Sequence, residues 1–337
     1  MRLHAKYATI FMLTFCLLLH VSVSHGDDIK KTIPLELNVA ILPYLSFSPL
    51  FVAMDEGFFE EQGLRIKISK FAQSPEVIPA LSQGRLDVAG SFMSVSLFNA
   101  IAHGADIKIV TCKMYIDPQS CTSVGLLAKR SLVENGELKN PVQLKGRRIA
   151  INEATIEGYW VEKLLKTAGL NLNQVKHGDL PAPTVFAAFE NGSIDLASES
   201  EPWITRSIKA GHAVMWMPME KVVPNFQFAF LLYGPTLLKK NPEAGNRFMV
   251  AYLKALHQLG LGKTSRNLEI IAKYTKLGPA LLKEACWPSF HKDGRINTQS
   301  VIEFQSWAVE KGYMKQSMPI DKIWDSSFIK YANKVLK

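Results

Sequence analysis

Apolar runs of strand length alternate with amphipathic stretches along most of the chain. The first run, Leu37–Ile41, ends at Pro43. Ser48 is suited to cap a helix, and residues 51–58 carry apolar side chains at helical spacing. Residues 64–68 then alternate as a strand does. Two strands joined through a helix form a parallel unit, and ligands of open α/β sheets bind at the carboxyl edge of such strands.

The same alternation continues toward the C-terminus. We expect further strands at 86–89, 107–112, 123–129, 175–180 and 228–232, and helices beginning at Ser74 and covering 93–103, 159–168 and 184–191. The remainder reads as amphipathic helices, which we expect to pack on the first domain. Strands and helices in alternation predict an α/β fold.

The length, composition and N-terminal segment indicate the number of domains and export from the cytoplasm. The chain has 337 residues, of which 47% are hydrophobic and 20% charged, enough for two domains. Residues 1–26 resemble a signal peptide, with basic Arg2 and Lys6, an apolar stretch at 8–19 and a cleavage position after Gly26. The apolar stretch is short for a membrane span, although an uncleaved anchor is the alternative.

The charge is positive but dispersed. Removing residues 1–26 leaves 37 basic side chains against 30 acidic ones, a net charge of +7. No run of five or more Lys or Arg is present, so the pattern disfavours nucleic acid as a partner. A modest positive charge can raise the local concentration of anionic solutes.

Three cysteines follow the signal segment. Cys112 and Cys121 flank a short stretch that could close into a disulfide loop in an exported protein, and the sequence leaves that pairing open. Cys286 is expected to stay single and buried. Without a CxxC pair or a Cys/His cluster, we expect no metal site and no cofactor.

Four ordered motifs carry a family resemblance. They are GFFEEQGL at 57–64, LSQGRLDVAGS at 81–91, LKGRRIAIN at 144–152 and DLPAPTVFAAFENGSIDLASESEPWI at 179–204. Their order and spacing resemble solute-binding proteins of ABC importers, in the group that takes up nitrate, sulfonates, taurine or thiamine-pyrimidine precursors. The resemblance covers roughly residues 37–238.

The resemblance implies a type II periplasmic-binding-protein fold, in which two α/β domains are joined by a two-crossing hinge and close like a Venus flytrap. Domain I would comprise 33–121 and 233–337, and domain II 122–232, with crossings near Cys121 and Tyr233. The implied function is an exported, periplasmic, monomeric protein that captures a small organic solute between the domains. Its partners would be an ABC permease and ATPase.

Four loops that follow strands and precede helices are the candidate site: 43–48, 90–94, 152–159 and 181–184. Helix N-termini offer free N–H groups and partial positive charge, although the same hydroxyls could serve only as helix caps. The residues that we expect at the ligand are Tyr44, Ser46, Ser48, Ser91, Phe92, Ser94, Tyr115, Asn152, Thr155, Tyr159, Pro183, Thr184 and Glu201.

Two carboxylates, Glu199 and Glu201, are candidates for binding an amine group of the ligand. They lie two residues apart and share one face if the segment is extended. Glu201 could accept a hydrogen bond from a ligand amine, or it could cap the next helix. The family often carries an aromatic where Ser200 stands. Carboxylates and aromatics together favour an aromatic or amine-bearing organic ligand, with an organic anion as the alternative.

Catalytic patterns are weak. No GxSxG, HExxH, GxxxxGK[ST] or GxGxxG sequence occurs, and the five histidines after the signal segment are scattered. The fungal pyrimidine synthases share the fold implied here and use a sacrificial histidine with a cysteine-rich iron site, which this chain lacks. We therefore expect no enzyme. The alternatives are an enzyme related to those synthases, or a ligand-sensing subunit for a membrane kinase.

Overall fold

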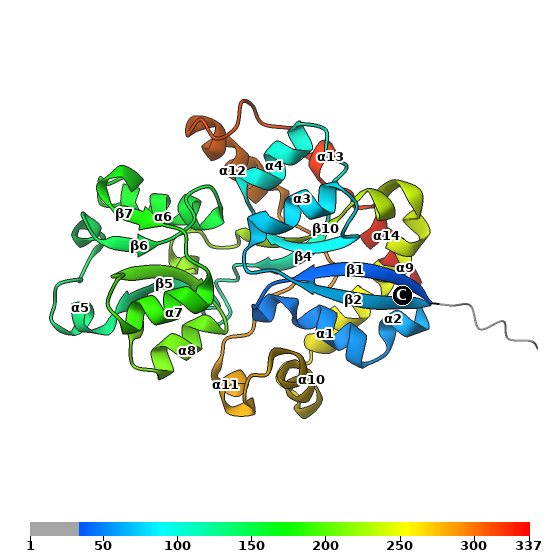
Figure 1. The fold of residues 1–337 in the computed structure, drawn as a ribbon, viewed down its shortest axis with the longest axis horizontal. Helices are drawn as coiled ribbons and strands as arrows, with labels where there is room; N and C mark the ends of the chain where they lie inside the picture. The colour runs from blue at the N-terminus through cyan, green and yellow to red at the C-terminus, as the bar shows by residue number, and fades with distance from the viewer. Residues whose placement is uncertain (1–33) are drawn as a thin grey trace, which may run out of the picture. The chain divides into compact units, whose positions relative to one another are not determined.

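The computed structural model describes residues 34–337, apart from the side chain of Pro75, so the predicted signal segment lies outside the described residues. Two five-stranded sheets each form the centre of one lobe (Figure 1). The first sheet contains β1 (Leu35–Ile41), β2 (Leu64–Lys70), β3 (Val88–Phe92), β4 (Lys108–Tyr115) and β10 (Gln227–Tyr233). The second contains β5 (Val124–Lys129), β6 (Arg148–Ala150), β7 (Lys176–Gly178), β8 (Leu196–Ser200) and β9 (Ala213–Pro218).

Helices cover both sheets and fill the C-terminal third. Before β10 they are α1 (Ser48–Asp55), α2 (Phe58–Glu61), α3 (Val77–Ser82), α4 (Val95–Ala102), α5 (Arg130–Glu134), α6 (Ile156–Lys166), α7 (Ala182–Glu190) and α8 (Trp203–Lys209). After it come α9 (Pro242–Leu259), α10 (Ser265–Thr275), α11 (Pro279–Glu284), α12 (Thr298–Glu310), α13 (Ile320–Ile323) and α14 (Ser327–Val335). None of these helices is both long and apolar enough to cross a bilayer.

The two sheets share one topology. The first has the order β2-β1-β3-β10-β4 and the second β7-β6-β8-β5-β9. In each, the central strand of a parallel trio is flanked by the other two, and an antiparallel strand follows on one side. Loops after the parallel strands therefore gather at one edge of each sheet, where ligands of such sheets bind.

The chain crosses between the sheets twice. One crossing, at 116–123, lies where the sequence predicts it, near Cys121. The other lies at 219–226, before β10, whereas the sequence predicts it after β10, near Tyr233. All of β10 is buried and pairs with β3 and β4 of the first sheet, so a boundary after residue 232 cuts off a strand of that sheet.

The C-terminal helices contact both lobes, whereas the sequence predicted packing on the first domain. Figure 1 shows α9 beside α1 and α2, and α12 near α4. From α12, Trp307 donates through Nε1 to a buried Glu162 carboxylate on α6 at 2.8 Å. Lys311 donates to the same carboxylate at 3.1 Å. This desolvated contact fixes α6 of the second lobe against the C-terminal segment.

The cysteine pairing differs from the one that the sequence offered. Cys121 forms a disulfide with Cys286, and Cys112 is free and buried. Cys112 lies inside β4, where Gln227 Nε2 on β10 donates to its sulfur at 3.2 Å. The suggested Cys112–Cys121 loop is therefore wrong, because Cys112 is enclosed within the sheet while Cys121 lies in the exposed crossing. The disulfide ties that crossing to the segment after α11.

A lysine is enclosed in the core of the first lobe. Lys113 on β4 is 1% exposed, and its Nζ donates to Ser46 Oγ at 2.6 Å. The ammonium lies 4.0 Å from the Phe47 ring centroid and 5.2 Å from that of Phe92. Within residues 34–337 no carboxylate pairs with it. Burial lowers the pKa of Lys113 from 10.5 to about 7.

We predict that Lys113→Met removes a pH dependence of stability. The folded protein loses the Lys113 proton near pH 7, whereas the unfolded chain keeps it until about pH 10. The unfolded state therefore binds more protons in this window, and the free energy of unfolding of the wild type rises from pH 7 to pH 10. The variant lacks this rise and is more stable than the wild type below pH 7.

Urea unfolding of both proteins at pH 6, 8 and 9.5 tests this prediction. The difference between the two proteins isolates Lys113 from other titrating groups. An equal slope in both would contradict it.

Candidate ligand-binding site

A cavity of about 40 Å³ lies where the loops of the two lobes meet. The first lobe contributes the ends of β1, β2 and β3, and the second lobe the ends of β6, β7 and β8. The lining residues are Tyr44, Gln73, Ser74, Phe92, Ala150, Ile151, Asn152, Thr155, Glu157, Asp179, Leu180, Pro181, Val185, Ser198 and Glu199. The lining includes three carboxylates and no basic side chain.

Aromatic rings form the first-lobe wall. The Tyr44 ring packs edge-on against Phe92, with ring centroids 5.0 Å apart. Phe92 in turn packs on Phe228 of β10 at 5.1 Å, and its N–H donates to Ser74 Oγ at 2.8 Å. These contacts place a rigid ring at the cavity, with the Tyr44 hydroxyl close enough to three carboxylates to feel their charge.

Carboxyl groups form the second-lobe wall. Glu157, in the first turn of α6, accepts from the Asn152 N–H at 3.1 Å. Asp179 accepts from Asn152 Nδ2 at 2.7 Å. Glu199 on β8 is 4% exposed, and no side chain among the described residues donates to its carboxylate. Three acidic groups thus converge without a basic partner.

Burial is the main cause of their electrostatic state. It raises the pKa of Glu157 to about 8 and, helped by Glu157, holds the pKa of Glu199 well above its ordinary 4.5. Burial followed by the charges of Glu199, Glu157 and Asp179 also raises the pKa of Tyr44. Within residues 34–337 no three His, Cys, Asp or Glu side chains converge closely enough to hold a metal ion. A cation brought by a ligand would find uncompensated acceptors.

Four of the thirteen predicted residues line this cavity: Tyr44, Phe92, Asn152 and Thr155. Each of the four predicted loops contributes at least one lining residue, and the 181–184 loop contributes Pro181. All four predicted loops therefore reach this cavity, although most of the side chains named in them do not line it.

Ser94 and Thr155 hold the lobes together in a backbone pairing that we call the strap, residues 93–95 and 154–156. The two residues form an antiparallel bridge. The Val95 N–H donates to Ala154 C=O, and the Ile156 N–H donates to Met93 C=O, both at 2.9 Å. Amides at the starts of α4 and α6, which the sequence offered to a ligand, are thus already used.

Three further predicted hydroxyls bind protein groups. Ser46 accepts from Lys113, Ser48 Oγ donates to Leu45 C=O at 2.7 Å, and Ser91 Oγ donates to Phe92 C=O at 3.0 Å. Pro183 and Thr184 are exposed on α7, away from the lining.

The other two predicted tyrosines, Tyr115 and Tyr159, lie outside the cavity. Tyr115 donates to Asp117 at 3.1 Å and stacks on His291 with centroids 3.9 Å apart. Tyr159 is buried, stacks on Phe226 at 5.0 Å and donates to Glu303 at 3.2 Å. Both side chains fix neighbouring segments of the protein.

Glu201 does not line the cavity, because its carboxylate is fully engaged elsewhere. It accepts from Thr205 Oγ1 at 2.7 Å, from the Thr205 N–H at 3.1 Å and from the Cys286 N–H at 3.0 Å. Strand β8 ends at Ser200, so the extended geometry that would align Glu199 with Glu201 stops between them. Glu201 therefore orients the start of α8 and the disulfide segment.

Several lining residues were not predicted. Glu199 is a candidate for an amine in the sequence but is absent from the thirteen residues expected at the ligand, although its place as the last acidic residue of the buried β8 identifies it. Asp179 directly follows β7, and Gln73 and Ser74 follow β2, the same position after a strand that the sequence analysis used elsewhere. Glu157 carried no signal apart from its place in the first turn of a helix.

Curated relatives match most of the chain. A protein of Brucella abortus (strain 2308), named as a binding protein, is 26% identical over 281 residues, covering 82% of each chain. A protein of Bacillus subtilis (strain 168), named as an aliphatic sulfonates-binding protein, is 26% identical over 254 residues, covering 74% of this chain and 71% of its own.

Solved structures share the fold at low identity. The ligand-binding component of an ABC-type import system from Staphylococcus aureus has a TM-score of 0.75 at 15% identity, covering 88% of this chain and 99% of its own. The alkanesulfonate-binding protein SsuA from Xanthomonas axonopodis pv. citri, bound to MOPS, has 0.68 at 19%, covering 86% and 98%. The desulfurization enzyme DSZB has 0.66 at 12%, covering 90% and 100%.

These structures show a two-lobed periplasmic-binding-protein fold, as the sequence resemblance implied. The family model described as NMT1/THI5 like matches residues 45–259, well over half of the chain. The chain belongs to the NMT1/THI5-like family.

Proposed function

We propose that this protein is the solute-binding component of an ABC importer and takes its ligand in the cavity between the lobes. The observation that carries the proposal is the meeting of six strand ends, three from each sheet, around one lined cavity. Capture between two lobes and delivery to a membrane permease require no chemistry at the site. The permease, its ATPase and a monomeric state complete the proposal, as does periplasmic export by residues 1–26.

We further propose that the ligand bears an amine or another cationic group. The cavity lining holds Glu157, Asp179 and Glu199 and no Lys or Arg. A buried carboxylate gains most from a charge-assisted hydrogen bond with a cation, whereas a sulfonate or carboxylate beside these groups would keep them protonated and form no such ion pair. A relative is named for binding aliphatic sulfonates, which are anions. The acidic lining of this cavity instead favours a cationic ligand.

The first prediction is binding without turnover. A thermal-shift screen over amines, aminopyrimidines, aromatic acids and sulfonates should find a ligand that raises Tm, because a ligand that binds only the folded state stabilises it. The hit should remain chemically unchanged after prolonged incubation, as mass spectrometry would show. A strain lacking the protein should lose high-affinity uptake of that solute.

Turnover of the hit would contradict this function. The check matters because the enzyme DSZB shares the fold. Intact uptake in the deletion strain, together with tight binding in vitro, would favour a sensing role instead.

The second prediction concerns Glu199. Glu199→Gln preserves the shape of the side chain and removes its charge, so affinity for an amine ligand should fall about ten-fold or more, the range for hydrogen bonds to charged groups. Calorimetry on the folded variant measures this loss. Glu153→Gln is the matched control, because Glu153 is an exposed acidic residue just before α6 and does not line the cavity.

The same ligand should bind with a defined pH dependence. Because burial raises the pKa of Glu157 to about 8, this carboxyl carries a proton at pH 7 in the free protein. A cation favours its ionised form, so binding releases protons and the affinity rises with pH up to about 8. Tighter binding in Glu199→Gln, or affinity that falls as pH rises, would point to an anionic ligand.

The third prediction is that the strap must open. An engineered cavity of about 150 Å³ binds benzene, whereas the cavity between the lobes is about 40 Å³, space for a few waters. An organic solute therefore enters only if the lobes part, with the crossings at 116–123 and 219–226 as the hinge. Solution scattering should show a larger radius of gyration for the free protein than for the saturated one. Identical values at saturation would contradict hinge closure.

A further inference from the structure

A second, larger cavity lies on the other side of Tyr44. It encloses about 230 Å³ and is lined by Ile41, Leu42, Pro43, Tyr44, Phe51, Lys70, Phe71, Pro202, Trp203, Arg206, Tyr274, Thr275 and Leu277. We propose that this cavity is a binding site for a small amphipathic organic anion, distinct from the cavity between the strand ends. The proposal goes beyond the solute-binding function and does not depend on it.

Aromatic and aliphatic side chains supply the apolar part of the site. Tyr274 stacks on Phe51 with parallel rings whose centroids are 5.1 Å apart. Trp203 from the second lobe is fixed on the other side, because its Nε1 donates to Pro43 C=O at 3.0 Å. A ring or short alkyl body placed between these walls would be removed from water on most sides, which is the usual setting of a small-molecule pocket.

Two cations supply the polar part. The Arg206 guanidinium lies 4.6 Å from the Trp203 ring centroid and 5.7 Å from that of Phe186, cation–π contacts that use the ring faces and not the carboxylate-binding N–H groups. Lys70, at the end of β2, is the second cation. Among residues 34–337 neither forms an ion pair, and no acidic side chain lines the cavity. A carboxylate or sulfonate head group would complete this charge pattern.

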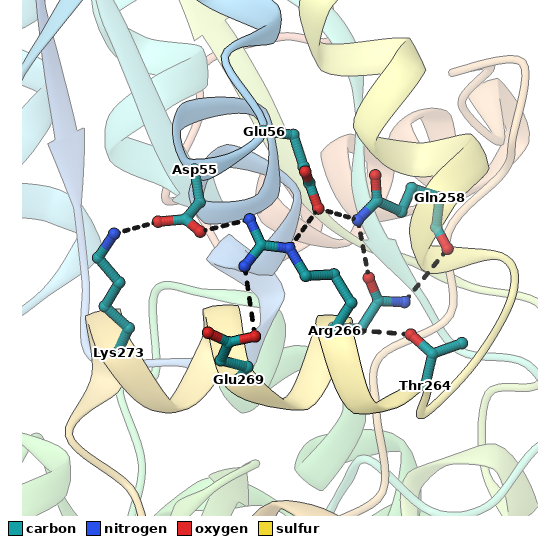
Figure 2. A network of polar contacts seen from close by, with 8 residues as sticks. Asp55, Glu56, Gln258, Thr264, Arg266, Glu269 and Lys273 are labelled. Atoms are coloured by element: carbon teal, nitrogen blue, oxygen red, sulfur yellow. Dashed lines mark hydrogen bonds and ion pairs between the residues drawn. The ribbon is translucent and has the colours of Figure 1, made fainter.

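The walls are held in place by polar contacts outside the cavity. Figure 2 shows α10 clamped to α1, with Asp55 between Arg266 and Lys273. Arg266 Nε also donates to Glu56 at 2.9 Å. Asp55 has a side chain 7% exposed, so it holds both ends of α10 from a semi-buried position. This network fixes Tyr274, which lies next to Lys273, before any ligand arrives.

The opposite wall is fixed in the same way. Glu201 accepts three hydrogen bonds from Thr205 and Cys286, which sets the start of α8 and therefore the positions of Trp203 and Arg206. Each wall is thus ordered by its own lobe, so less freedom is lost when the two walls close on a ligand, and more of the contact energy is retained as affinity.

Size limits the ligand to a small molecule. An engineered cavity of about 150 Å³ accommodates benzene, so 230 Å³ accommodates one ring with a compact charged group. The electrostatic contrast with the first cavity separates the two ligand classes, because one lining is purely acidic in its charges and the other purely basic.

Calorimetry with benzenesulfonate as the probe tests the proposal, with benzylamine as the matched cation. We expect benzenesulfonate to bind the wild type and benzylamine to bind this cavity no more than weakly. Arg206→Gln should weaken benzenesulfonate about ten-fold, the effect of one charge-assisted hydrogen bond. Lys70→Gln should weaken it less, because Lys70 is exposed. The exposure of Lys70 also makes this variant safe for folding.

Two controls remove a positive charge without touching the cavity: Lys209→Gln on the same helix as Arg206, and Lys67→Gln on the same strand as Lys70. Both should bind benzenesulfonate as the wild type does. The proposal is overturned if the wild type does not bind the probe, or if the cavity variants match their controls. It is also overturned if Glu199→Gln changes benzenesulfonate affinity while Arg206→Gln does not, since that result places the anion between the strand ends.

Discussion

The uncompensated carboxyl groups of the second lobe determine the chemistry of the first cavity. Glu199 is almost fully buried, and Glu157 raises its pKa further, yet no lysine or arginine lines the space that they share. Burying a charge without a partner costs several kcal/mol, so such groups hold protons until a cation arrives. A positively charged ligand would lower the pKa values of these groups and bind their ionised forms.

The shared topology of the two sheets is what brings these groups together. Each parallel trio delivers three loops to one edge, and the two crossings turn those edges toward each other, as the strap between Ser94 and Thr155 shows. The C-terminal helices then limit the motion available, because Glu162 on α6 is buried against Trp307 and Lys311 of α12. The disulfide from Cys121 to Cys286 joins one crossing to the C-terminal segment between α11 and α12.

Much of the fold could be predicted from the sequence, because strand runs such as Leu37–Ile41 and glycine-punctuated helices are local signals. The strap and the enclosed Lys113 could not, since each depends on contacts between residues more than 60 positions apart. The same limit explains the cysteines, where proximity along the chain suggested Cys112 and the fold selected Cys286. For the site, position after a strand identified the loops. Only the end of β8 at Ser200 separates Glu199, which lines the cavity, from Glu201, which braces a helix.

Tyr44 connects the two cavities, since it lines both. On one side, burial raises the pKa of the Tyr44 hydroxyl, and the charges of the three nearby carboxylates, Glu199, Glu157 and Asp179, raise it further. The hydroxyl therefore keeps its proton and remains a hydrogen-bond donor. On the other side its ring lies near Trp203 and Arg206, among groups suited to an anion. Its ring also rests on Phe92, which Lys113 approaches from beneath. The Tyr44 ring forms part of the wall of both cavities. A ligand that moves the ring in one cavity therefore changes the shape of the other, because the surrounding side chains are closely packed. The packing of Tyr44 is therefore one short physical route by which a ligand in one cavity would affect the other.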